Sequence, residues 1–137
     1  MFDVKWAFLW GTLKEEIYMH QPRGFKDGDW HETVWHILYT IYGLKQSTLE
    51  WYEQVCVVMS DLGFTCAESD HALFYYDELE NATSSVHVCC FMGWHVNNGM
   101  AASTSHPFLQ HIKSSIAECF GLKELGPITW YLGMQFE

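Results

Sequence analysis

The chain has 137 residues, of which 49% are hydrophobic and 17% aromatic, and its formal net charge at pH 7 is -10 with only seven Lys and Arg. This length and composition are typical of one folded domain, or of part of one, with a hydrophobic core, and they exclude a disordered chain. The scarcity of basic residues argues against a free-standing nucleic-acid-binding module, because such modules cluster Lys and Arg to neutralise phosphates.

Nothing in the sequence predicts membrane insertion or secretion. The longest apolar run, residues 86–96, is shorter than the roughly 18 to 20 residues that cross a bilayer. Asp3 and Lys5 lie where the apolar region of a signal peptide would begin. The five cysteines have no CxxC spacing, which favours free thiols. We therefore expect an intracellular protein, cytoplasmic or nuclear, with no membrane partner.

The first forty residues are predicted to be mostly extended. The expected strands or extended pieces are residues 2–9, 17–19 and 34–39. Asp3 would be a strand-end acid, and Glu15 with Glu16 predicts a short turn. Pro and Gly in residues 21–29 indicate a loop between the later two extended pieces.

The clearest predicted helix begins at Ser47. Ser47 to Glu50 fits a capping box, in which the Ser47 hydroxyl accepts from the Glu50 amide and the Glu50 side chain reaches back. Gly63 is expected to end the helix, with Phe64 folding back onto Met59 in a Schellman motif. The apolar stripe expected to face the core is Trp51, Val55, Val58 and Leu62, widened by Tyr52, Cys56 and Met59.

Residues 86–103 predict a β-hairpin. Two apolar runs flank Asn98-Gly99, and both residues of a tight hairpin turn must tolerate positive φ. Residues 72–76 predict the preceding strand, joined to the hairpin by a polar loop with Asp77, Glu78, Glu80 and Asn81. Asp70 and His71, ahead of that strand, fit either a loop hydrogen bond or an acid–base pair, of which the loop hydrogen bond is favoured.

The hairpin also contains metal-ligand residue types. His87 with Cys89 and Cys90 suggests part of a zinc site. In a strand, however, His87 and Cys89 share one face while Cys90 points to the other. This alternation argues against zinc binding by these three residues.

A second helix is predicted between Ser105 and Gly121. Ser105 would cap it, Pro107 would lie in its first turn and Gly121 would end it. Its expected apolar face is Leu109, Ile112, Ile116 and Cys119. A turn at residues 125–127 and a last strand at residues 130–136 follow. Strands interleaved with two helices predict an α+β fold, with helices packed on one face of an antiparallel sheet.

Several segments along nearly the whole chain match one family pattern in order. They are Asp3-Val4-Lys5, Ala7-Phe8-Leu9 with Gly11, Glu15-Glu16-Ile17-Tyr18-Met19, Gln21-Pro22, Gly24-Phe25, Tyr42-Gly43-Leu44-Lys45-Gln46, Trp51-Tyr52, Gly63-Phe64, Ser69-Asp70-His71, Leu125-Gly126-Pro127 and Tyr131-Leu132-Gly133-Met134. Together they resemble the reverse transcriptase of copia-type retrotransposons. The resemblance implies that residues 1–137 are a single partial domain, the fingers and palm of a right-hand polymerase without its thumb and ribonuclease H.

The resemblance also implies site residues, cofactors and partners. Asp3 matches the first catalytic carboxylate and metal ligand, and Phe8 the bulky side chain that crowds the 2′-position of an incoming nucleotide. The nucleotide-binding residues would be Phe8, Tyr42, Lys45 and Gln46, and the primer-grip residues Tyr131, Leu132, Gly133 and Met134. Family members use Mg²⁺, deoxynucleotides and an RNA or DNA template-primer.

The sequence departs from this family at the catalytic hairpin. The family's Tyr-Val-Asp-Asp is matched here by His95, Val96, Asn97 and Asn98. Nucleotidyl transfer uses two Mg²⁺ ions held by carboxylates, whereas Asn supplies oxygen without charge. Removing one unit charge about 4 Å from a divalent ion, at an effective dielectric constant of about 20, forfeits about 8 kcal/mol of attraction before solvent compensation.

We therefore expect catalytic positions Asn97 and Asn98 to be degenerate, Asp3 to be a remnant, Mg²⁺ not to be bound and the fragment to be inactive. The alternative is a domesticated, non-catalytic binding module on the palm scaffold, for which the net charge argues against nucleic acid as partner. A working polymerase that uses Asp70 or Glu68 instead is disfavoured. Sheet edges left unpaired by missing strands predict self-association.

Overall fold

The computed structural model describes residues 1–26, 33–79 and 87–136. Its elements are β1 (Phe2–Val4), the 3-10 helix η1 (Ala7–Trp10), β2 (Thr12–His20), β3 (Val34–Tyr39), α1 (Ser47–Asp61), β4 (Thr65–Cys66), β5 (Leu73–Leu79), β6 (His87–His95), β7 (Asn98–Ser103), α2 (His106–Phe120), β8 (Leu122–Glu124), β9 (Trp130–Tyr131) and β10 (Met134–Gln135). The predicted loop residues Asp27, Gly28, Asp29, Glu80 and Asn81, and Val86 at the start of the predicted hairpin, lie outside the described residues.

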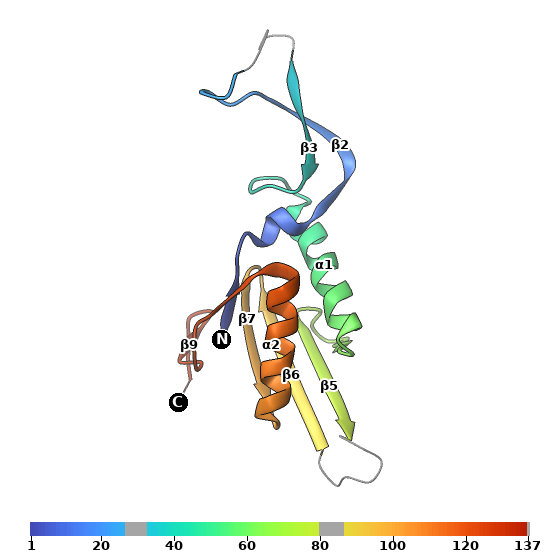
Figure 1. The fold of residues 1–137 in the computed structure, drawn as a ribbon, viewed down its shortest axis with the longest axis vertical. Helices are drawn as coiled ribbons and strands as arrows, with labels where there is room; N and C mark the ends of the chain where they lie inside the picture. The colour runs from blue at the N-terminus through green and yellow to red at the C-terminus, as the bar shows by residue number, and fades with distance from the viewer. Residues whose placement is uncertain (27–32, 80–86, 137) are drawn as a thin grey trace.

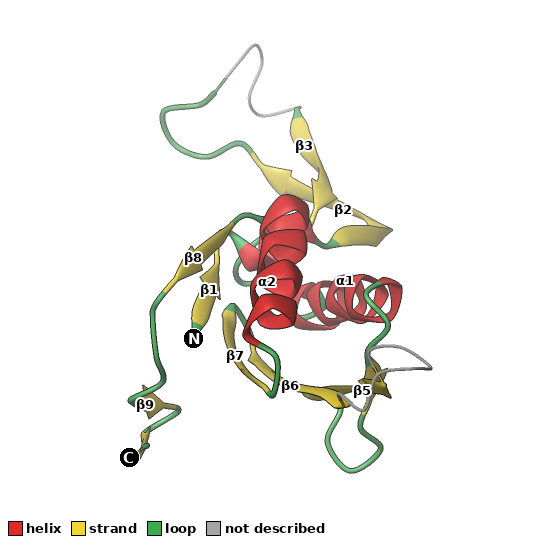
Figure 2. Cartoon of the chain, turned by 60° about the horizontal axis from the view of Figure 1, so that its bottom comes forward, coloured by secondary structure: helices red, strands yellow, loops and turns green. Residues whose placement is uncertain are grey.

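Six of the strands form one antiparallel sheet in the order β4-β5-β6-β7-β1-β8. Figure 2 shows α1 and α2 together on one face of this sheet. The predicted α+β class, with helices on one face of an antiparallel sheet, is therefore confirmed. A separate ribbon, β2 paired with β3, extends away from the sheet at the top of Figure 1. In the part of the chain that the structure describes, no helix combines the length and hydropathy needed to cross a membrane.

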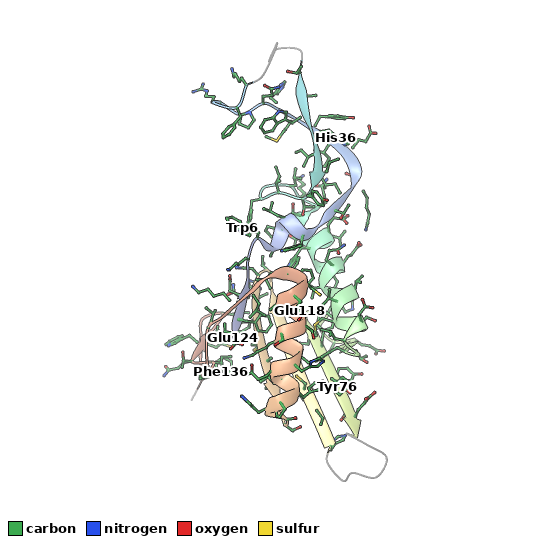
Figure 3. All side chains as sticks on the ribbon, viewed as in Figure 1. Trp6, His36, Tyr76, Glu118, Glu124 and Phe136 are labelled. Atoms are coloured by element: carbon green, nitrogen blue, oxygen red, sulfur yellow. The ribbon has the colours of Figure 1, made fainter. Side chains whose placement is uncertain are left out.

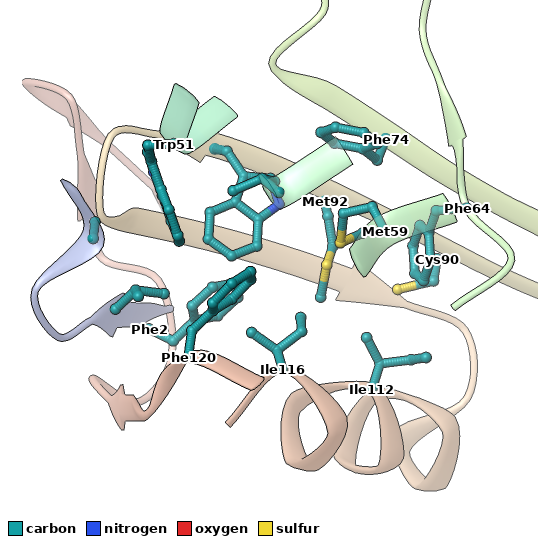
Figure 4. Packing of buried hydrophobic residues seen from close by; sticks show 14 residues of the cluster. Phe2, Trp51, Met59, Phe64, Phe74, Cys90, Met92, Ile112, Ile116 and Phe120 are labelled. Carbon is teal, nitrogen blue, oxygen red and sulfur yellow. The ribbon is translucent and has the colours of Figure 1, made fainter. Parts of the chain in front are cut away.

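The core lies between the sheet and the two helices, as the close view in Figure 4 shows. Along β6, the buried Val88, Cys90 and Met92 alternate with the more exposed Cys89 and Phe91, as expected for a strand that is covered on one face only. The helices contribute Trp51, Val55 and Met59 from α1 and Ile112, Ile116 and Phe120 from α2. Burial of this apolar surface is the main force that holds the helices on the sheet.

The start of α1 differs from the predicted capping box. Gln46 occupies the N-cap position, and Ser47 is already helical. The buried Ser47 Oγ donates to the Ile41 carbonyl at 2.6 Å, and the Glu50 carboxylate forms an ion pair with Lys14 at 3.4 Å. The capping box is therefore wrong, because both side chains are used by the segments that precede the helix.

The end of α1 confirms the predicted Schellman motif. Gly63 has a φ of +82°, its N–H donates to the Ser60 carbonyl at 2.9 Å, and the Phe64 N–H donates to the Met59 carbonyl at 2.9 Å. The apolar stripe is also confirmed, with Met59 rather than Leu62 as its fully buried member near this end.

Helix α2 begins as predicted and buries a slightly different face. The Phe108 N–H donates to the Ser105 Oγ at 3.4 Å, and Gly121 ends the helix with a φ of +66°. Cys119 was expected on the apolar face and is exposed instead. Phe120 takes its place, because four residues after Ile116 the helix returns to the same side.

The first predicted strand, residues 2–9, is wrong beyond Val4. Trp6 adopts a left-handed φ of 58°, and the 3-10 helix Ala7–Trp10 follows, so pairing with β7 and β8 stops at β1. The Trp6 side chain is 68% exposed and lies at the surface near the base of the β2–β3 ribbon (Figure 3).

Two further predictions concern the β2–β3 ribbon, and one of them is wrong while the other is confirmed. The turn expected at residues 15–16 is wrong, because β2 runs through it as one strand with a register irregularity between Thr12 and Ile17. The strand expected at residues 34–39 is confirmed as β3.

The predicted last strand, residues 130–136, is a short hairpin instead. Strands β9 and β10 pair with each other, and the turn between them holds Leu132 with a φ of 50° and Gly133 with a φ of 81°. Two successive positive φ values are typical of the tight turns that match the twist of a β-hairpin.

Candidate functional site

The β6–β7 hairpin exists as predicted, but its turn is two positions earlier than expected. His95 and Asn98 are the last paired residues, and Val96 and Asn97 form the turn, with a φ of 56° at Val96. The expected turn at Asn98-Gly99 is therefore wrong. Both of these residues belong to β7.

Gly99 has a packing role rather than a turn role. It lies opposite Trp94 in β6 and opposite Phe2 in β1, in the middle of three neighbouring strands. A Cβ atom at this position would collide with the Phe2 ring, which is fully buried. Glycine is therefore required so that β1 and its Asp3 can approach the hairpin closely.

The turn brings the three predicted catalytic positions together. Asp3 is the partner of Asn98 across the β1–β7 pair, and the Val4 N–H donates to the Asn97 carbonyl at 2.8 Å. The Asn97 amide donates from Nδ2 to the Asp3 carboxylate, over a separation of 94 residues in sequence. Asn98 Nδ2 in turn donates to Asn97 Oδ1 at 3.2 Å.

Two buried aromatic side chains hold the turn from outside. The Trp51 indole Nε1 of α1 donates to the Val96 carbonyl at 2.6 Å. The Tyr131 hydroxyl of β9 donates to the Asn98 carbonyl at 3.3 Å, and burial raises the pKa of this phenol, so it remains a protonated donor. The helical spacing of Trp51 predicted only its place in the core and not its hydrogen bond to the turn, although a buried indole N–H usually has an acceptor.

The side chains of Asp3, Asn97 and Asn98 are joined to one another by hydrogen bonds. Asp3 supplies the carboxylate, and Asn97 directs an N–H toward it. The opposite orientation of the Asn97 amide would set its oxygen against the carboxylate oxygen and is therefore unfavourable. One carboxylate and two amides are a poor match for a pair of Mg²⁺ ions, which bind through charged oxygen ligands.

The predicted nucleotide-binding residues divide into two groups. Phe8 and Tyr42 meet edge to face, with ring centroids 4.9 Å apart. Gln46 instead donates from Nε2 to the Glu15 carboxylate of β2 at 3.2 Å, and Lys45 is exposed. The predicted primer-grip residues all lie in the β9–β10 hairpin, where Tyr131 is buried and the other three, Leu132, Gly133 and Met134, are exposed.

Asp70 has a local role, since its Oδ1 accepts from the Ala72 N–H at 2.9 Å. Of the two interpretations that the sequence left open for Asp70 and His71, the loop hydrogen bond is confirmed.

Comparison with known proteins identifies relatives of the chain. Residues 1–137 match the family model for reverse transcriptase (RNA-dependent DNA polymerase). The chain is 32% identical over 133 residues to the Retrovirus-related Pol polyprotein from transposon RE2 of Arabidopsis thaliana, which covers 97% of this chain and 9% of that protein. It is 30% identical over 132 residues to a transposon Ty5-1 protein of Saccharomyces cerevisiae, with 96% of this chain and 41% of that protein covered.

A third relative is the Retrovirus-related Pol polyprotein from transposon TNT 1-94 of Nicotiana tabacum, 30% identical over 133 residues, which cover 97% of this chain and 10% of that protein. No solved structure matches the chain. The chain thus spans less than half the length of each of these relatives. Because the family model extends over all its residues, the chain belongs to the reverse transcriptase (RNA-dependent DNA polymerase) family, in the form found in copia-type retrotransposons.

Proposed function

We propose that this chain is a reverse-transcriptase-like fragment of a copia-type retrotransposon polyprotein that keeps the fold around the site of nucleotidyl transfer and does not catalyse that reaction. The observation that carries the proposal is the contact between Asn97 and Asp3, in which a neutral amide donates to a carboxylate. By resemblance, positions 97 and 98 are those of the family's Asp-Asp pair.

Electrostatics explains why this contact opposes metal binding. Two carboxylates in the places of Asp3 and Asn97 would repel each other, and a divalent cation between them would relieve the repulsion. A carboxylate and an amide N–H attract each other directly, so a cation gains little by entering and would have to break a charge-assisted hydrogen bond. Asn97 therefore removes one charged ligand and also the repulsion between carboxylates that a bound cation would relieve.

Primer extension tests the proposal. The purified chain is incubated with a primed RNA or DNA template, deoxynucleotides and either Mg²⁺ or Mn²⁺, beside a known active reverse transcriptase in the same buffer. We expect no extended product above a protein-free blank. The matched variant Asp3→Asn separates true activity from a contaminant: product that the variant abolishes would overturn the proposal, and product that both proteins make equally would come from a contaminating polymerase.

We also propose that the fragment does not bind template-primer on its own. Its net charge is -10, and Lys14 and Lys113 are held in ion pairs with Glu50 and Glu124. A gel-shift series from low to high salt checks this, because binding through phosphates would be strongest at low salt. We expect no retardation at any salt concentration, and retardation that weakens steeply as salt rises would contradict the proposal.

A further inference from the structure

A second polar cluster lies at the opposite end of β6 from the turn. His87 and Cys89 occupy alternate positions of β6 and therefore share a face, while the next residue, Cys90, points to the opposite face and is fully buried in the core. Asp77 of β5 is the direct cross-strand partner of Cys89. At about 3.3 Å per residue, His87 and His95 are about 26 Å apart, so this cluster is independent of the turn.

The three side chains converge on one point. Asp77 Oδ1 lies 2.6 Å from His87 Nε2 and 3.2 Å from Cys89 Sγ, and Cys89 Sγ lies 3.4 Å from His87 Nδ1. One ligand atom from each residue lies within 4.8 Å of the other two. Ligands of a tetrahedral zinc ion, with bonds of about 2.0 to 2.3 Å, are about 3.3 to 3.8 Å apart. The cluster therefore needs small side-chain movements, mainly a rotation of the His87 ring, to surround an ion.

The backbone that carries two of the three residues is fixed by Thr104. Its hydroxyl accepts from the Cys89 N–H at 2.9 Å and donates to the His87 carbonyl at 3.2 Å. The Ser103 hydroxyl also donates to the Cys89 carbonyl at 2.9 Å. The side chains of His87 and Asp77 are about half exposed, which leaves them free to rotate and leaves one side of the cluster open to solvent.

We propose that Asp77, His87 and Cys89 form a binding site for Zn²⁺ or a similar borderline-soft divalent cation. One thiolate, one imidazole and one carboxylate are the ligand types that zinc prefers, and three protein ligands leave a fourth position for water or an external ligand. A thiolate and a carboxylate together balance the charge of the ion. The sequence argued against zinc because Cys90 faces away, but the third ligand comes from the neighbouring strand.

Titration with Co²⁺ tests the site, because tetrahedral Co²⁺ bound to a thiolate has an intense visible spectrum and a sulfur-to-metal absorption band. The full chain is titrated under a phosphine reductant, and Zn²⁺ is then added as competitor. We expect one Co²⁺ per chain with a thiolate band that Zn²⁺ displaces. Cys89→Ser should abolish the band, and Asp77→Asn and His87→Ala should each weaken binding by about 10-fold or more.

Two control variants make the assignment sharp. Cys119→Ser removes an exposed cysteine on α2, and His111→Ala removes an exposed histidine on the same helix, so neither should change the titration. Circular dichroism verifies that every variant is folded. A wild-type chain without a thiolate band would overturn the proposal, as would a band that persists in Cys89→Ser. Neither result bears on primer extension, which depends on the turn.

Discussion

Strand β6 carries a polar cluster at each end, and the two clusters differ in how they are built. At the turn, Asp3 meets the amides of Asn97 and Asn98 between strands packed so closely that Gly99 has no room for a side chain. At the other end, the Asp77 carboxylate, the His87 imidazole and the Cys89 thiol lie together on the open face of the sheet. From this difference we propose that the balance of charge among the ligand groups, in addition to a rigid framework, decides whether a cation binds.

The largest effect is expected from filling the space at Gly99. Gly99→Val would force its side chain into the Phe2 ring, and overpacking of this kind should lower the free energy of unfolding by about 3 kcal/mol. Urea unfolding measures the change. Ala102→Val on the exposed face of the same strand is the control and should change stability little. Equal stability of Gly99→Val and the wild type would mean that β1 does not pack closely on the hairpin.

A smaller effect is expected from restoring one acid at the turn. Asn97→Asp sets a second carboxylate against Asp3, and the repulsion should cost about 2 kcal/mol at neutral pH. The repulsion raises a carboxyl pKa in the folded variant, so the folded state binds more protons than the unfolded state and the cost shrinks as pH falls toward about 4. Thermal unfolding across pH checks this. Asn97→Ala, which removes the amide without adding charge, should show no such pH dependence, and identical pH profiles would contradict the account.

The next effect is expected from removing the Trp51 indole N–H, which donates to the turn. Trp51→Phe keeps an aromatic ring in the core and removes the indole donor to the Val96 carbonyl, which should cost about 1.5 kcal/mol. Urea unfolding compares it with Trp130→Phe, whose parent side chain is 59% exposed and should contribute little. If the two variants lose the same stability, the hydrogen bond at the turn has no measurable role.

The smallest effect is expected at the open end of β6. Cys89→Ser and Asp77→Asn should leave the melting temperature of the metal-free chain unchanged, because these groups face solvent. Adding Zn²⁺ should raise the melting temperature of the wild type and not that of either variant, since a ligand that binds only the folded state stabilises it. Destabilisation of the metal-free variants would assign the cluster a structural role instead.

Features set by neighbours in sequence were predictable. Gly63 ends α1 and Ser105 caps α2 through hydrogen bonds within a few residues, and the run of β-branched and aromatic residues at 34–39 predicts β3. The existence of the β6–β7 hairpin was likewise predictable, although its register was not. The sequence also predicted which faces of α1 and α2 are apolar, apart from the exchange of Cys119 for Phe120 at the end of α2.

Features set by distant partners were not predictable. Ser47 was predicted to be a helix cap, but its hydroxyl bonds instead to the Ile41 carbonyl of the preceding loop. The local spacing of residues 47–50 does not reveal this partner. Gly99 resembled a turn glycine because Phe2 approaches it from the other end of the chain. Asp77 and Glu78 were predicted to lie in a loop, and this prediction is wrong because β5 continues through both residues by pairing with β6. Only the register of β5 against β6 sets Asp77 opposite Cys89.

The loss of the free-ion electron paramagnetic resonance signal of Mn²⁺ measures whether the turn formed with Asn97 and Asn98 binds a divalent cation. All proteins carry Asp77→Asn so that the cluster at the far end of β6 does not contribute. We expect that the chain with Asn97 and Asn98 leaves the signal unchanged, while Asn97→Asp combined with Asn98→Asp removes it at the same Mn²⁺ concentration. Binding by the chain with native Asn97 and Asn98 that Asp3→Asn abolishes would contradict the account, because the amides would then have sustained a metal site.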